Sequence, residues 1–134
     1  MKYSIIVDAS VLCSFANTRD VHHDKATALI TSMLNESELI ITDHIFDEVL
    51  SVTSRKAGRS HAIMLGKYII QSEFRLVQTG RDALEQAWKA FQKYEYLSFT
   101  DCTIISLMKV SRIKRLATFD KHFKNIEGIE TVDS

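Results

Sequence analysis

The distribution of apolar residues divides the chain into two kinds of segment. Short apolar runs, several of them rich in β-branched residues, alternate with longer segments in which apolar residues recur every three or four positions. The short runs predict strands and the longer segments predict amphipathic helices. The predicted strands are residues 3–7, 38–42, 74–78 and 114–118, with a short fifth at 129–132. The predicted helices are residues 11–17, 23–34, a segment from about 43 to a break near Gly58, 61–71, 81–94 and 101–111.

The order of these segments predicts an α/β fold. Strands that alternate with helices form a mostly parallel sheet, here of four to five strands, with helices packed on both faces. The chain has no proline, four glycines and no repetitive or linker-like stretch. Residues 1–134 are therefore expected to form a single domain. In the helix at 81–94, the residues expected to face inward are Leu84, Ala87, Trp88 and Phe91.

Composition narrows the choice of protein class. The 17 basic residues balance the 17 acidic ones, so bulk positive charge does not mark this chain as a nucleic-acid binder. No apolar run approaches the ~20 residues that span a bilayer, and the N-terminus lacks the apolar core of a secretory signal. We therefore expect a cytoplasmic protein with no membrane partner. Cys13 and Cys102 form no CxxC motif, and we expect them to be small buried residues.

Two carboxylates follow apolar runs that are far apart in the sequence. Asp8 follows the run at 3–7, and Asp120 follows the run at 114–118. Ligands of open parallel sheets bind beyond the carboxyl ends of the strands, at the point where strand order reverses. If these two strands are neighbours at that point, their carboxylates converge on one crevice. An acid at the end of a buried strand also costs free energy unless it has a partner.

Two further acids are expected at the same edge of the sheet. Glu48 lies one to two turns into the helix that follows the second strand, and Asp101 opens a later helix with Ser98 or Thr100 as its cap. Taken singly, Asp101 is also explained as a helix-dipole residue and Glu48 as one solvated charge. The functional interpretation rests on all four acids reaching one edge.

Four converging carboxylates repel one another, and no flanking residue supplies an obvious lysine counterion. A bound divalent cation removes this repulsion, and ligands that are all oxygen favour Mg²⁺ or Mn²⁺ over zinc. His22, His23 and His44 do not form a zinc motif, and His23 is expected at the start of a helix. Without these four acids the sequence has 13 acidic and 17 basic residues, so the rest of the protein would carry a charge of +4.

Taken together, these motifs resemble the PIN domain family, in particular the VapC-type toxin ribonucleases. They occur in the family's order and span essentially the whole chain. The matching motifs are VDASVL with Asp8 and Ser10, the helix with Glu48, LSFTDCTII with Asp101, and TFDKHF with Thr118, Asp120 and Phe123.

The resemblance implies a three-layer α/β/α fold with an endoribonuclease site that depends on Mg²⁺ or Mn²⁺. It also implies a homodimer and, for a toxin, a small antitoxin protein that occludes the site. All four acids are expected to be catalytic residues and metal ligands. Asp8 and Asp101 would hold the metal, while Glu48 and Asp120 would either bind a second ion or orient the attacking water as a general base.

Four neighbouring residues are expected to support this chemistry. The hydroxyls of Ser10 and Thr118 would hydrogen-bond a ligand carboxylate or a metal-bound water, although each is equally well explained by a backbone contact at a strand end. Lys121 and His122 adjoin the last acid and are expected to contact the RNA substrate. No base-reading motif is visible, so the sequence does not predict which RNA is cut.

Other classes of protein remain open at this point. A phosphatase of the haloacid-dehalogenase type would place a second aspartate two residues after Asp8, where this chain has Ser10. A phospho-receiver domain would need paired acids near the end of the first strand. An RNA-processing PIN nuclease without an antitoxin, or a non-catalytic PIN-like interaction module, would carry similar motifs.

A two-fold dimer is expected to use the helices between residues 43 and 71. The second of these helices carries apolar residues that could form an exposed patch, and such patches mark protein interfaces. The residues of this expected patch are Met64, Tyr68, Ile69 and Ile70.

Overall fold

The computed structural model describes residues 3–134, and its centre is strand β1 (Tyr3–Val7). Five strands form one sheet in the order β3-β2-β1-β4-β5, and every pair is parallel. The predicted α/β fold is confirmed, with a sheet that is entirely parallel. The remaining elements are α1 (Ala9–Ala16), α2 (His23–Glu36), β2 (Ser37–Thr42), α3 (Asp43–Ala57), α4 (Arg59–Gln71), β3 (Arg75–Val77), α5 (Arg81–Lys93), α6 (Phe99–Ser111), β4 (Arg115–Ala117), the one-turn 3-10 helix η1 (Lys121–Phe123) and β5 (Glu130–Val132).

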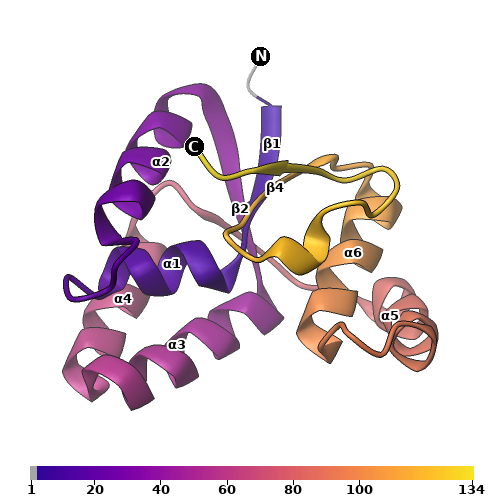
Figure 1. Ribbon diagram of the computed structural model, residues 1–134, viewed down its shortest axis with the longest axis horizontal. Coiled ribbons are helices and arrows are strands. Elements are labelled where there is room, and N and C mark those ends of the chain that lie inside the picture. Colours follow the sequence, from indigo (N-terminus) through magenta and orange to yellow (C-terminus); the bar gives the residue numbers. More distant parts are fainter. Residues whose placement is uncertain (1–2) are drawn as a thin grey trace.

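Helices cover both faces of the sheet. Figure 1 shows α1 to α4 on one side of β1 and α5 and α6 on the other. The helices change from one face to the other because the chain first runs from β1 to β2 and β3, on one edge of β1, and then crosses to β4 on its other edge. Connections between parallel strands keep the same right-handed sense, so a reversed direction puts the helices on the opposite face. Strand β1 therefore has strands on both edges and helices on both faces, and Ile5, Ile6 and Val7 are buried in the core.

Most element boundaries lie within two residues of the predicted ones. Helix α1 starts at Ala9, earlier than expected, because the Asp8 carbonyl already accepts hydrogen bonds from the N–H groups of Val11 and Leu12. Gly58 separates α3 from α4 as predicted, and its φ of 98° is one that residues with a side chain rarely adopt. The 3-10 helix η1 was not predicted.

The expected inward face of α5 is confirmed for Ala87 and wrong for its three large residues. Leu84, Trp88 and Phe91 are 41%, 56% and 42% exposed, whereas Ala83 and Ala87 are buried. Helix α5 packs closely on α6, and the small alanine side chains permit that close approach. Its large apolar residues consequently face outward.

The expected apolar patch on α4 is only partly present. Met64 and Ile70 are exposed, but Ile69 is fully buried in the core and Tyr68 is partly buried against it. Ile63, which was not predicted, is exposed instead. The predicted patch included both Ile69 and Ile70, although the 3.6-residue period turns these two neighbours to different sides of the helix.

The structure also tests the predicted burial of the two cysteines and the predicted start of α2. Cys102 is fully buried as predicted, whereas Cys13 is only partly buried. Helix α2 begins at His23, as expected. No helix within residues 3–134 is both long and apolar enough to cross a membrane.

Candidate active site

The sheet topology brings the two distant aspartates to the same edge. Strands β1 and β4 are neighbours with Val7 opposite Ala117, and the Asp8 N–H donates to the Ala117 carbonyl at 2.9 Å. Because the strands are parallel, both end at this edge. Asp8 follows β1 directly, and Asp120 follows β4 at the N-terminus of η1. This edge is also where strand order reverses.

One cavity at this edge, of about 310 Å³, is lined by all four predicted acids. They come from four places in the chain: the end of β1, the middle of α3, the first turn of α6 and the turn after β4. The structure therefore brings together residues that the sequence analysis could place only on separate elements. The predicted acids that line this cavity are Asp8, Glu48, Asp101 and Asp120, and Asp20 is a fifth acid in its lining.

Asp8 is the deepest of these acids and is held by two hydroxyl groups. Its side chain is only 4% exposed. Ser10 Oγ donates to Asp8 Oδ2 at 2.9 Å, and Thr118 Oγ1 donates to the same oxygen at 2.8 Å. The Phe119 N–H in turn donates to Ser10 Oγ at 3.0 Å. Among residues 3–134, Asp8 Oδ1 has no side-chain donor, so this oxygen is the one that could bind a ligand.

The charges of the acids oppose one another inside the cavity. Burial raises the pKa of Asp8, an effect that the Thr118 and Ser10 hydroxyls counter and that Asp101 reinforces. Burial raises the pKa of Glu48 to about 7, with further contributions from Asp8, Asp101 and Asp120. Both shifts disfavour the charged forms in the metal-free protein. A bound cation would reverse this preference.

Asp101 has a structural role in addition to its place in the cavity. Ser98 Oγ accepts from the Asp101 N–H, and Asp101 Oδ2 accepts from the Ser98 N–H, each at 3.1 Å, which makes a capping box for α6. Burial still raises the Asp101 pKa, against the lowering effect of the Ser98 hydrogen bonds. The sequence-based choice between Ser98 and Thr100 as the cap is thus settled in favour of Ser98.

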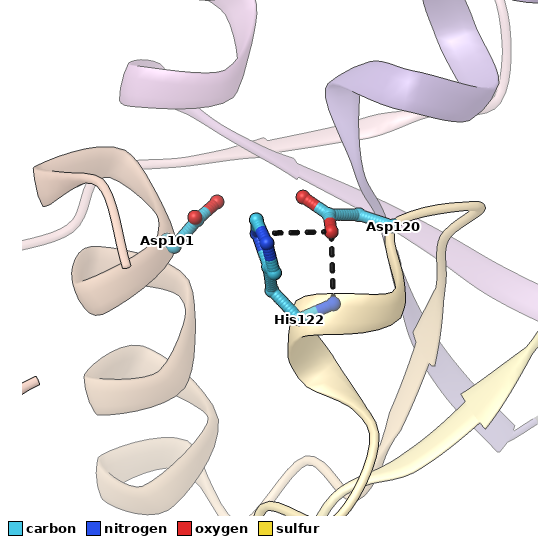
Figure 2. Close-up of side chains that lie close together, drawn as sticks. All are labelled: Asp101, Asp120 and His122. Carbon is cyan, nitrogen blue, oxygen red and sulfur yellow. Dashed lines mark hydrogen bonds and ion pairs between the residues drawn. The ribbon is translucent and has the colours of Figure 1, made fainter. Parts of the chain in front are cut away.

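Asp120 and His122 form a compact turn at the mouth of the cavity. Asp120 Oδ1 accepts from the His122 N–H at 2.9 Å and lies 3.2 Å from His122 Nδ1. Figure 2 shows the His122 ring between the carboxylates of Asp101 and Asp120. One ligand atom from each of these three residues lies within 4.8 Å of the others, a spacing that a metal ion could span. Of the two residues expected to contact RNA, neither Lys121 nor His122 is among the residues that line the acid cavity.

We predict that Thr118→Val destabilises the protein in chelator at neutral pH by about 1–3 kcal/mol, since a hydrogen bond to a charged group is lost. The reason is that Thr118 Oγ1 donates to Asp8 and also accepts from the Asp120 N–H at 3.0 Å. Thr118→Ser keeps the oxygen and is the matched control. Equal urea-unfolding curves for Thr118→Val and wild type would show that this hydroxyl does not stabilise Asp8.

The sequence analysis missed several residues that line the cavity. Lys56 belongs to α3, about two turns beyond Glu48, and its side chain lines the cavity together with the acids. The others come from α1 and from two turns with no detectable periodicity. Lys56 alone has a signal in the sequence, because with Arg55 and Arg59 it forms a basic cluster that is a candidate contact for the RNA backbone. The polar and aromatic lining residues to which the sequence assigned no role at the site are Cys13, Asp20, His22 and Phe119.

A larger cavity, of about 540 Å³, lies between α3 and α4 and has no acidic residue in its lining. Phe46, Leu50 and Ile63 form part of its apolar wall. The acid cavity is smaller than this one, but the residues that line it are more polar. The acid cavity lies at the switch point of the parallel sheet, which is where open α/β sheets bind their ligands.

Comparison with known proteins identifies the family. The model of the PIN domain family matches residues 5–129, so the chain belongs to this family. A VapC ribonuclease of Archaeoglobus fulgidus is 23% identical over 124 residues, which are 88% of this chain and 78% of that protein.

Solved structures share the fold. The Mycobacterium tuberculosis toxin VapC20, which cleaves the sarcin–ricin loop, has a TM-score of 0.79 and 24% identity over 87% of this chain and 90% of its own. VapBC2 of Rickettsia felis, solved with a DNA fragment from its promoter, has a TM-score of 0.74 and 12% identity over 96% of both chains. These likenesses support the PIN-like α/β fold of the present chain.

Proposed function

We propose that this protein is a metal-dependent endoribonuclease, the toxin of a VapBC-type toxin–antitoxin pair. The observation that carries the proposal is the cavity lined by Asp8, Glu48, Asp101 and Asp120 at the sheet's switch point. The related VapC ribonuclease from Archaeoglobus fulgidus supports the choice of RNA as substrate. Such an enzyme would act in the cytoplasm.

The donor set fits Mg²⁺ or Mn²⁺. Carboxylate oxygens from four acids suit these hard cations, and the two imidazoles nearby, His22 and His122, are outnumbered by these carboxylates. Asp8 and Asp101 would hold the ion, with Glu48 and Asp120 completing the site. When bound, such an ion lowers the pKa of a water molecule and polarises a phosphoryl oxygen.

The side chains of the cavity would divide the remaining work. Glu48, half-buried beside the other acids, is placed to accept the proton of the attacking water. Ser10 and Thr118 fix the orientation of Asp8 through its Oδ2. His122 and Lys56 carry donors at the rim of the acids, where they could contact the phosphate.

We expect Mn²⁺ or Mg²⁺ at millimolar concentration to raise the melting temperature, because the cation binds the folded acid cluster and not the unfolded chain. The same ions should support cleavage of single-stranded RNA, and Ca²⁺ is a control that would bind without supporting cleavage. Differential scanning fluorimetry and a fluorescent RNA substrate measure the two effects. A protein that binds neither Mn²⁺ nor Mg²⁺ at millimolar concentration would contradict the acidic-site interpretation.

The groove between α3 and α4 suits an antitoxin segment. Ile63 and Ile70 are 51% and 63% exposed and line the cavity of about 540 Å³. An amphipathic helix can place its apolar face in such a groove. Related VapBC proteins of Rickettsia felis and Salmonella typhimurium were solved as complexes bound to DNA, which is consistent with a partner here.

We also expect a homodimer that uses α3 and α4, in which the exposed Met64, outside the groove assigned to the antitoxin, takes the place of the buried Ile69. Light scattering at ~100 µM, a concentration that populates even a weak dimer, should give twice the monomer mass. Met64→Glu should shift the protein toward the monomer, whereas Lys89→Glu on α5 should not. A monomer at this concentration would argue against the interface.

The alternatives are an RNA-processing PIN nuclease without an antitoxin and a non-catalytic PIN-like module. RNA cleavage with Mn²⁺ separates the non-catalytic module from both nucleases. Co-purification with the product of an adjacent small reading frame separates the toxin from the processing nuclease. An inactive protein with an intact metal site would favour the interaction module.

A further inference from the structure

A second cavity, of about 270 Å³, adjoins the acid cavity on the side of η1. It lies between the start of α2, the turn from β4 to η1, and the end of β5. The two cavities share three lining residues, so a ligand could pass from one to the other without leaving the protein surface. We name this second cavity the lysine pocket; the residues that line it are His22, Lys25, Thr118, Phe119, Asp120, Lys121, Lys124, Thr131 and Asp133, of which His22, Phe119 and Asp120 are shared.

The lysine pocket is positively charged next to a strongly acidic cavity. Three lysines line it, and Asp120 already belongs to the acid cluster. Lys25 lies 3.9 Å from Asp133, but both side chains are about half exposed, so this ion pair is weak. Within residues 3–134, Lys121 and Lys124 make no ion pair. The chain as a whole is neutral, so this positive charge is a local feature.

Phe119 connects the lysine pocket to the acid cavity. Lys25 Nζ lies 5.3 Å from the centroid of the Phe119 ring, and the His22 ring packs against the same ring at 5.5 Å. The Phe119 backbone N–H donates to Ser10 Oγ, which in turn donates to Asp8. The position of the pocket relative to Asp8 is therefore fixed by direct contacts.

We propose that the lysine pocket binds a backbone phosphate of the RNA strand, next to the phosphate that is cleaved. This inference rests on the proposed ribonuclease function. Four carboxylates repel a polyanion, so the strand needs positive charge on at least one side of the acids. Lys25, Lys121 and Lys124 supply it, and the shared wall places that charge directly beside Asp120.

The test is RNA binding by charge-reversed variants. A fluorescein-labelled single-stranded RNA is titrated with Asp8→Asn protein, which prevents cleavage, and the anisotropy is followed over a range of salt concentrations. Adding Lys25→Glu or Lys124→Glu should weaken binding about tenfold, the loss of one charge-assisted contact to phosphate. Each should also reduce the salt slope by about 0.7, the value for one phosphate contact on a single strand.

The matched control is Lys89→Glu, which makes the same charge change on the exposed surface of α5. The pocket variants should keep the wild-type rise in melting temperature with Mn²⁺, because they leave the four acids intact. Without the Asp8 substitution, they should raise KM for RNA cleavage more than they lower kcat.

Two results would overturn the proposal in different ways. If the wild type cleaves RNA and the pocket variants bind RNA no more weakly than Lys89→Glu, the lysine pocket is not a phosphate site and the ribonuclease proposal stands. If the wild type neither binds nor cleaves RNA with Mn²⁺, the ribonuclease proposal fails and the pocket proposal fails with it.

Discussion

Replacing Asp8 with asparagine should abolish RNA cleavage and leave the metal-free protein at least as stable as the wild type. Burial makes the charged form of Asp8 unfavourable, and repulsion from Asp101 adds to this cost. Asparagine removes the charge but keeps an oxygen that can accept from Ser10 and Thr118. Metal affinity should fall, and cleavage should drop by at least a hundredfold, since residues that only orient metal ligands are already worth about ten- to a hundredfold.

Both halves of this prediction are measured on the same samples. Wild type and Asp8→Asn are melted in chelator and then assayed on single-stranded RNA with Mn²⁺. Asp47→Asn is the control, because Asp47 is exposed on α3 and does not line the acid cavity. Cleavage at the wild-type rate would refute the mechanism. A marked loss of stability in chelator would instead make Asp8 a structural residue, and the loss of cleavage would then say nothing about catalysis.

Affinity for Mn²⁺ should rise about fivefold when the pH is raised from 6 to 7, and should change little above pH 8. Metal binding requires ionised carboxylates, so one proton has to leave Glu48 below its pKa of about 7. Isothermal titration calorimetry in two buffers of different ionisation enthalpy should detect about one proton released at pH 6 and almost none at pH 8. An affinity that is constant between pH 6 and pH 8 would show that Glu48 does not bind the ion.

Glu48→Gln provides the matched variant for this measurement. It should bind Mn²⁺ more weakly and lose most of the pH dependence. Without metal, the stability of the folded protein depends on pH in the opposite direction. Because the folded protein raises the Glu48 pKa from 4.5 to about 7, it binds this proton more tightly than the unfolded chain does. This contribution to stability is present below pH 4.5 and is lost as the pH rises to about 7.

The sequence was sufficient to predict the sheet and the four acids, because those features depend on local patterns. Apolar runs that end in an acid, such as the one before Asp8, identify a strand and its carboxyl end together. The pairing of β1 with β4 could only be assumed, since nothing in either run specifies its neighbour. The Thr118 bond to Asp8 depends on that pairing, so the sequence predicted a ligand carboxylate or a metal-bound water as the partner of this hydroxyl without identifying Asp8.

Helix α5 shows the limit of periodicity more clearly. Its apolar residues do follow a helical period, and the helix is present as predicted. The period identifies an apolar face but not what covers it. Here Ala83 and Ala87 face α6, while Trp88 faces outward. Small residues on one side of a helix can allow closer packing than large residues on the other, and a single sequence does not reveal which side the fold selects.

The acid cavity lies between two parts of the fold that differ in how strongly the surrounding structure resists their local opening. Asp8 extends from β1, which is hydrogen-bonded to strands on both edges and buried on both faces. Asp120 and the lysines beside it lie on or next to η1, a single turn of three residues (Figure 1). Amide hydrogens of β1 would exchange only through global unfolding, whereas those of η1 would exchange through local opening. A brief opening of that turn would move Asp120 and the neighbouring lysines away from the cavity while Asp8 stays in place. The site could therefore lose and regain its activity without unfolding of the domain.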